Sequence, residues 1–152
     1  MWRRLFFVAA AAAALLLATQ GTAMAKMVIF SAIKGRVLLN GKPAVGAVLV
    51  REFNWGWKDE NGTDRTTTDA SGAFSLPVIE RSSLLGSILP HEPLVRQVIT
   101  VKYDGKDYDA WAFYKHNYRE NGENEGKPID VTCRLEAERK RHGDVMGLCE
   151  FN

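Results

Sequence analysis

The chain has 152 residues, of which 20 are basic and 18 acidic, so its formal net charge is +2. Arg3 and Arg4 account for this excess, and residues 26–152 carry equal numbers of acidic and basic side chains. This balance excludes the strongly basic surface that nucleic acid or an anionic membrane would require. The 127 residues from position 26 onward are the size of one domain.

The N-terminal segment has the pattern of a secretory signal peptide. Arg3 and Arg4 precede an apolar run from Leu5 to Ala18, and Ala23-Met24-Ala25 is a small-x-small cleavage site. An uncleaved membrane anchor is the alternative, but the run is shorter than the about 20 residues that a span needs. We therefore expect a signal peptide over residues 1–25, cleavage after Ala25, and a single periplasmic or secreted domain over residues 26–152 with no membrane span.

The stretch from Gly35 to Val50 predicts two short strands joined by a tight turn. Apolar residues recur at every second position on both sides of Asn40-Gly41, and Asn-Gly accepts the positive φ angles of such a turn. Pro43 removes a backbone donor where the chain re-enters a strand. This pattern is typical of a β-hairpin or of a strand-turn-strand corner.

The remainder of the chain alternates between short strand patterns and turns. Asp104-Gly105 is the strongest hairpin signal. Polar composition predicts loops at 58–65 and 115–127, and breakers predict a long connection over 78–93 with one helical turn near 82–85. The expected strands cover residues 27–30, 66–68, 73–76, 95–103, 107–114 and 129–135. Short strands without a long helix predict an all-β fold, an antiparallel β-sandwich.

The two cysteines, Cys133 and Cys149, both lie in the predicted exported domain. An exported chain meets an oxidising compartment, and two cysteines allow only one intramolecular pairing. A bridge of this loop size stabilises by about 3 kcal/mol in the chain-entropy model. A catalytic thiol and a metal pair are the alternatives, but the spacing matches no zinc motif. We expect a structural disulfide that holds the C-terminal tail on the domain.

Two motifs resemble those of the carboxypeptidase regulatory-like, or transthyretin-like (prealbumin-like), domain. The first runs Gly35-Arg36-Val37 and then Gly41-Lys42-Pro43-Ala44-Val45-Gly46-Ala47, and the second is Thr68-Asp69-Ala70-Ser71-Gly72-Ala73-Phe74-Ser75-Leu76. The resemblance implies a sandwich of seven to eight strands. The remainder is similar to a group of small exported bacterial proteins of unassigned function. Hydroxyisourate hydrolases of this fold end in a Tyr-Arg-Gly-Ser-type tail, from which Leu148 to Asn152 departs.

Candidate binding residues come from two loops. Trp55 and Trp57 project to the same side of an extended segment, where they form either an exposed platform or a cap on the open end of the sandwich. The segment from Lys115 to Asn121 mixes aromatic and charged groups, which suits recognition. Its candidate binding residues are Lys115, His116, Tyr118 and Arg119.

No catalytic or metal-binding signature accompanies these loops. His91, His116 and His142 lie far apart and form no metal-binding spacing, and no serine stands in a nucleophile motif. We therefore expect no metal, no cofactor and no enzymatic activity.

The sequence predicts an exported, non-enzymatic module that holds a protein partner, for example an immunity protein or an inhibitor of a toxin acting in the periplasm. The alternatives are a carbohydrate- or cell-wall-associated accessory domain that uses Trp55 and Trp57, and a transthyretin-like hydrolase.

Overall fold

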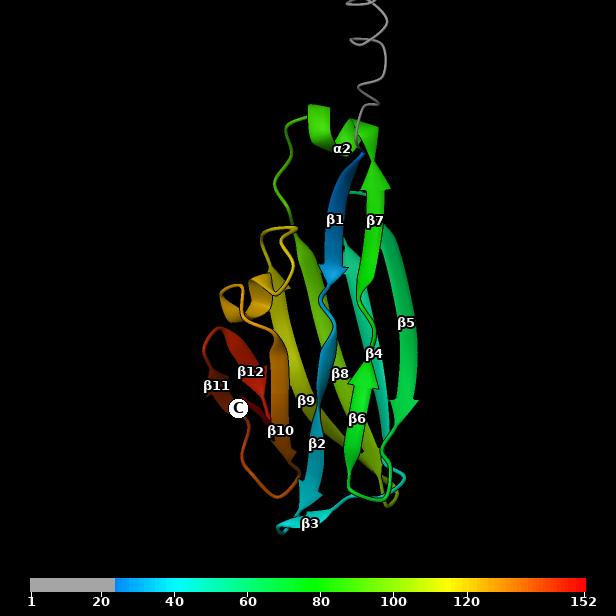
Figure 1. Cartoon of the computed structure of the whole chain (residues 1–152), viewed down its shortest axis with the longest axis vertical. Coiled ribbons are helices and arrows are strands. Elements are labelled where there is room, and N and C mark those ends of the chain that lie inside the picture. The colour runs from blue at the N-terminus through cyan, green and yellow to red at the C-terminus, as the bar shows by residue number, and fades with distance from the viewer. Residues whose placement is uncertain (1–23) are drawn as a thin grey trace, which may run out of the picture.

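The computed structural model describes residues 24–152, and the predicted signal peptide up to residue 23 lies outside the described residues (Figure 1). The described chain is built almost entirely from strands. In chain order the elements are β1 Ala25–Phe30, β2 Ile33–Leu39, β3 Lys42–Pro43, β4 Val48–Trp55, β5 Glu60–Thr67, β6 Ala73–Leu76, β7 Ile79–Ser83, α2 Leu84–Ile88, β8 Val95–Tyr103, β9 Lys106–Lys115, the 3-10 turn η1 Gly122–Asn124, β10 Ile129–Arg134, β11 Lys140–His142, β12 Val145–Gly147 and β13 Cys149–Phe151.

Two sheets form a sandwich, which confirms the predicted fold class. The larger sheet has the order β11-β12-β9-β8-β4-β5, and the smaller has the order β13-β10-β2-β3 with β6 also paired to β2. A further pair, β1 with β7, continues the β2–β6 ribbon towards one end of the molecule (Figure 1). The core between the sheets includes Val37 and Val131 from the smaller sheet and Leu49, Ile99 and Trp111 from the larger one.

Most strand pairs are antiparallel, but β2 and β10 run parallel, with Ile33 opposite Ile129 and Leu38 opposite Arg134. Alternation of apolar residues predicts that a segment is a strand but not the direction of its neighbour. A parallel pair requires a long connection between its two strands. Here the connection from β2 to β10 contains β4, β8 and β9, the central strands of the larger sheet. Gly35 is required in this pair, because a Cβ at Gly35 would overlap the carbonyl group of Val131.

The segment from Gly35 to Val50 is a corner between the two sheets. Asn40 and Gly41 have positive φ angles of 52° and 77°, and the tight turn they make pairs β2 with the short β3. The next strand, β4, belongs to the larger sheet. Thr68 fastens this corner, since its Oγ1 accepts a hydrogen bond from the Ala47 N–H at 2.8 Å and donates one to the Ala44 carbonyl at 2.5 Å.

The turn after Thr68 is held by Asp69, as its sequence predicted. The Asp69 Oδ1 accepts from the Ser71 hydroxyl and from the N–H groups of Ser71 and Ala73 at 2.8–3.0 Å. These hydrogen bonds, that of the Ser71 side chain first, hold the pKa of Asp69 below its usual value. Gly72 follows with a φ of 75°, and Phe74 returns into the core. The two motifs quoted above therefore contact each other directly.

Two predicted connections are wrong. The polar stretch 58–65 was expected to be a loop, but Glu60–Thr67 forms β5, which pairs with β4 over eight residue pairs. A strand at the edge of a sheet carries polar side chains, so composition alone does not distinguish it from a loop. The connection 78–93 likewise contains β7, and its helix covers Leu84–Ile88 rather than 82–85.

The hairpin at Asp104-Gly105 and the disulfide are confirmed. Tyr103 faces Lys106 across the turn, where Asp104 and Gly105 have φ angles of 50° and 72°. Cys133 and Cys149 are bonded across the β10–β13 pair, and both are buried. The disulfide therefore fixes the C-terminal strand to the smaller sheet.

Candidate binding groove

A groove of about 770 Å³ lies between the loop after β9 and the β11–β12 hairpin. Its volume is within the range of ligand-binding clefts. One wall comes from the 116–126 loop, the other from the β11–β12 hairpin, and β9 lies between them. The lining residues are Ala112, Phe113, Tyr114, His116, Asn117, Arg119, Glu120, Gly122, Glu125, Gly126, Arg141, Asp144 and Met146.

Strand β9 continues past its neighbour β12 at this groove. The β12 register ends at Met146 opposite Ala112, whereas β9 extends to Lys115 and stays paired with β8 on its other side. In the described part of the chain, no strand pairs with the outer edge of β9 over 113–115. Backbone groups of an unpaired edge can hydrogen-bond to an added strand.

The side chains around this edge combine apolar surface with charges of both signs. Tyr114 and Met146 are exposed, and Phe113 is half-buried. Arg119 and Glu125 take part in no ion pair among the described residues. Such a lining suits a polypeptide segment better than a small ion of one charge.

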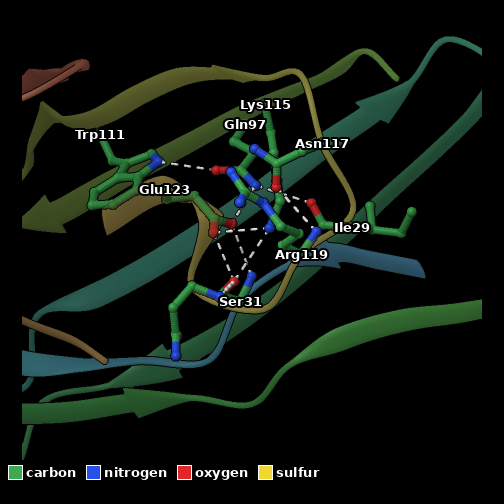
Figure 2. Close-up of polar contacts among 9 residues, drawn as sticks. Ile29, Ser31, Gln97, Trp111, Lys115, Asn117, Arg119 and Glu123 are labelled. Atoms are coloured by element: carbon green, nitrogen blue, oxygen red, sulfur yellow. Dashed lines mark hydrogen bonds and ion pairs between the residues drawn. The ribbon is translucent and has the colours of Figure 1, made fainter. Parts of the chain in front are cut away.

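A buried polar network stands behind the loop wall (Figure 2). The Lys115 Nζ lies 2.8 Å from the Glu123 Oε2, and both side chains are completely buried. Glu123 also accepts from the Ser31 N–H at 3.0 Å, from the Ser31 hydroxyl at 2.7 Å and from the Gln97 Nε2 at 2.8 Å. Gln97 in turn contacts the Trp111 indole and the Ile29 carbonyl. Residues from β1, β8, β9 and the loop thereby share one set of hydrogen bonds.

The ionisation of this network follows from its contacts. Burial by itself raises the pKa of Glu123, but the Lys115 ammonium and the hydrogen bonds from Lys115, Ser31 and Gln97 outweigh it and hold the pKa below its usual value. Burial lowers the pKa of Lys115, and the Glu123 carboxylate offsets only part of this effect. The contact between Lys115 and Glu123, together with the hydrogen bonds from Ser31 and Gln97, ties the groove loop to the core.

The second predicted site forms an aromatic cluster at the end of the sandwich nearest α2. The Tyr118 hydroxyl accepts from the Trp55 Nε1 at 2.8 Å and lies 2.9 Å from the His91 Nε2. The His91 ring stacks on Trp57 with centroids 4.1 Å apart, and the Lys58 ammonium lies 4.2 Å from the Trp57 centroid. Trp55 is only 2% exposed.

The structure therefore separates the six predicted binding residues. His116 and Arg119 line the groove. The prediction that Lys115 binds a ligand needs correction, because its side chain is buried and pairs with Glu123 inside the protein. Tyr118 joins the aromatic cluster instead of the groove.

Of the two roles considered for the tryptophan pair, an exposed platform or a cap on the sandwich, the structure favours the cap. Trp55 and Trp57 do lie together, with centroids 5.7 Å apart, but Trp55 is buried and Trp57 already contacts His91 and Lys58. The pair caps the end of the sandwich and offers no open face of Trp55 to a sugar ring.

Sequence reasoning missed the partners of Lys115. Gln97 gave one signal, since it stands among apolar residues of an alternating strand, at a position that faces the core. Lys115 gave a similar signal, because it continues the inward set of Trp111 and Phe113. Ser31 and Glu123 gave none, because they are separated by 92 residues and meet only through the fold.

No group of three or more His, Cys, Asp or Glu side chains within residues 24–152 is arranged to hold a metal ion. The same part of the chain contains no helix that is long and apolar enough to cross a membrane.

Comparison with known proteins gives one match. The model of a domain of unknown function (DUF6795) matches residues 33–138. This region contains Gln97, Lys115 and Glu123 of the buried network and the loop wall of the groove, whereas the β11–β12 hairpin lies beyond it. No curated protein and no solved structure matches the chain. Since the match covers most of the chain, the protein belongs to the DUF6795 family.

Proposed function

We propose that the protein is an exported, non-enzymatic binding module that holds an extended segment of a protein partner in the groove. The observation that carries this proposal is the unpaired outer edge of β9 at residues 113–115, which faces the groove. An extended peptide adds to such an edge through main-chain hydrogen bonds, and the flanking side chains supply specificity.

The lining supports a polypeptide ligand. Tyr114 and Met146 provide exposed apolar surface, while Arg119, Arg141, Glu120, Glu125 and Asp144 provide both signs of charge. The wall that carries Arg119 is fixed to the core by the Lys115–Glu123 pair. A fixed wall lowers the entropy that binding would otherwise cost.

The proposed compartment is the periplasm or the cell exterior. The buried Cys133–Cys149 disulfide is compatible with an oxidising environment, as is the leader pattern of the sequence. One specific form of the proposal is an immunity protein or an inhibitor of a toxin that acts in the periplasm. A gene with no toxin or secretion component beside it would count against that form.

The direct test compares capture by the wild-type protein with capture by two variants. Tyr114→Glu places a charge beside the open edge, and Val45→Glu places the same charge on an equally exposed residue of the corner that joins the sheets. A partner recovered from the cell envelope with wild type and Val45→Glu, but not with Tyr114→Glu, supports the groove. Equal recovery with all three proteins, or none with any, contradicts it.

Strand addition has its own readout. With the recovered partner bound, the amide protons of 113–115 that point away from β8 should exchange with solvent more slowly, since they gain hydrogen-bond partners. Unchanged exchange at these residues together with specific capture would assign the partner to another surface.

A further inference from the structure

The connection from β10 to β11 leads into a run of three basic residues, Arg139-Lys140-Arg141, which we call the basic tract. Within residues 26–152 it is the only place where basic residues are adjacent in the sequence. All three residues are exposed, and the connection runs along the outside of the sandwich (Figure 1). Exposed segments of this kind are where proteases cut a folded chain.

Ion pairs do not shield the basic tract. Each of its side chains has one acidic neighbour, at 3.0 Å for Arg139–Asp109, 3.6 Å for Lys140–Glu150 and 3.9 Å for Arg141–Asp144. All six side chains are at least 43% exposed, and ion pairs in water are weak. The basic groups can therefore exchange these neighbours for acidic groups of a protease.

The backbone at the basic tract is held weakly. Among the turn and loop hydrogen bonds between backbone groups of the described residues, none involves Glu138 or Arg139. Strand β11 begins at Lys140, is three residues long and, in the described chain, is an edge strand paired only with β12. A protease binds its substrate as an extended chain, and an irregular segment beside a short edge strand opens locally at low cost.

Exposed basic residues in other turns, or directly after them, are poorer substrates. Lys42 and Lys127 each precede a proline, which restricts the backbone of the residue before it. Lys58, Lys106 and Arg119 each precede an acidic residue, which an acidic pocket of a protease would repel. The basic tract thus combines exposure with a suitable residue on both sides of the bond.

A cut in the basic tract would not release the C-terminal strands. The bond between Arg139 and Lys140 lies between Cys133 and Cys149, which form the disulfide. Beyond the cut, β12 pairs with β9 and β13 pairs with β10, and Val145 is part of the core. The product would be two chains that share one core and stay covalently joined.

We propose that the Arg139–Lys140 bond is a processing site for a protease that selects basic residues on both sides of the bond it cuts. Water adds across the peptide bond, which leaves a carboxylate on Arg139 and an amino group on Lys140. The cut converts the domain into a two-chain protein held by its disulfide. It also gives the β11–β12 wall of the groove a free end, because Arg141 of β11 lines the groove. This inference is independent of what the groove binds.

The first test is limited digestion of the exported, oxidised protein with trypsin, stopped at the first cut within residues 26–152. Without reductant, we expect the intact mass to increase by one water and no fragment to be lost. After reduction, two chains should appear, and the smaller should begin at Lys140. Tryptophan fluorescence should not change before reduction, because Phe151 of the retained piece still packs against Trp111.

Two variants with matched changes in charge identify the site. Arg139→Gln/Lys140→Gln/Arg141→Gln should slow the first cut about tenfold, because the remaining sites need a larger local opening. The control Lys42→Gln/Lys58→Gln/Lys106→Gln removes the same charge from exposed residues beside other turns and should be cut at the wild-type rate. A first cut at any other bond of the wild type, or equal rates for all three proteins, would overturn the proposal.

The second test asks whether the bond is cut in the protein's own compartment. Protein is purified from its own cell envelope without reductant, and single-chain protein is incubated with the same envelope fraction. We expect a fraction of the molecules to carry the added water and to separate on reduction into the two chains that trypsin produces. Only single-chain protein in both samples would overturn the proposal, even if trypsin cuts at Arg139.

Discussion

Replacement of Glu123 by alanine should destabilise the protein more than any surface change. Four donor contacts converge on this carboxylate at 2.7–3.0 Å, and one donor is the completely buried Lys115 ammonium. Removal of one partner from a buried pair leaves an uncompensated charge and costs about 3–5 kcal/mol. The free energy of unfolding of a whole domain is about 5–15 kcal/mol, so this loss is a large share of the total stability.

The pair Lys102–Asp107 provides a matched control. Its Nζ and Oδ2 are 2.7 Å apart, almost the same separation as in the buried pair, but both side chains are more than half exposed. Exposed pairs contribute about 0.2–1 kcal/mol. Urea unfolding of wild type, Glu123→Ala and Asp107→Ala, followed by tryptophan fluorescence, measures both costs with the disulfide intact.

The pH dependence supplies an independent check. The pKa of Glu123 is lower in the folded protein than its ordinary value of 4.5. The unfolded chain therefore binds more protons below that value, so the contribution of Glu123 is present above pH 4.5 and disappears as the pH falls through the folded pKa. The difference in unfolding free energy between wild type and Glu123→Ala should shrink over this acidic range.

Equal costs for Glu123→Ala and Asp107→Ala would refute the reasoning, since burial would then make no difference to the pair. A difference between wild type and Glu123→Ala that stays constant from neutral to acidic pH would refute the assignment of an ionised carboxylate.

Two further predictions concern the aromatic cluster and the disulfide. Tyr118→Phe removes the acceptor of the buried Trp55 indole N–H and should cost about 1–3 kcal/mol in thermal or urea unfolding, whereas Tyr114→Phe in the exposed groove should cost almost nothing. The double change Cys133→Ser/Cys149→Ser should lower the free energy of unfolding by about 3 kcal/mol, because the bridge closes a loop with a sequence separation of 16, and thiol labelling of the denatured, unreduced wild type should find no free cysteine. Labelling of two thiols, or an unchanged midpoint for the serine variant, would contradict the latter.

The fold was predictable where an element is determined by residues close to it in the sequence. Alternation in Ile129–Leu135 placed Cys133 on the core side, and Asp104-Gly105 marked a hairpin, because both signals depend only on nearby residues. The edge strand β5 was not predictable, since its polar residues are stabilised by pairing with β4. The parallel pairing of β2 with β10 has no local signal at all.

The groove was partly predictable for the same reason. The loop composition identified His116 and Arg119, but the opposite wall, with Arg141 and Met146, comes from the β11–β12 hairpin and is brought there only by the β12–β9 pairing. Lys115 was among the predicted binding residues because it begins a segment that mixes aromatic and charged groups. Its role in the core depends on Glu123 and Ser31, which only the tertiary structure brings together.

The parallel pairing of β2 with β10 also sets the order in which the protein can mature. Strand β2 ends at residue 39 and β10 begins at residue 129, so the centre of the smaller sheet stays open until most of the chain has been made. The disulfide joins β10 to β13, so both of its cysteines follow β2 by more than 90 residues in the chain. During synthesis the N-terminal strands therefore expose apolar residues such as Val37 without a partner. A chain built in this way cannot complete the centre of its smaller sheet until its C-terminal strands are available.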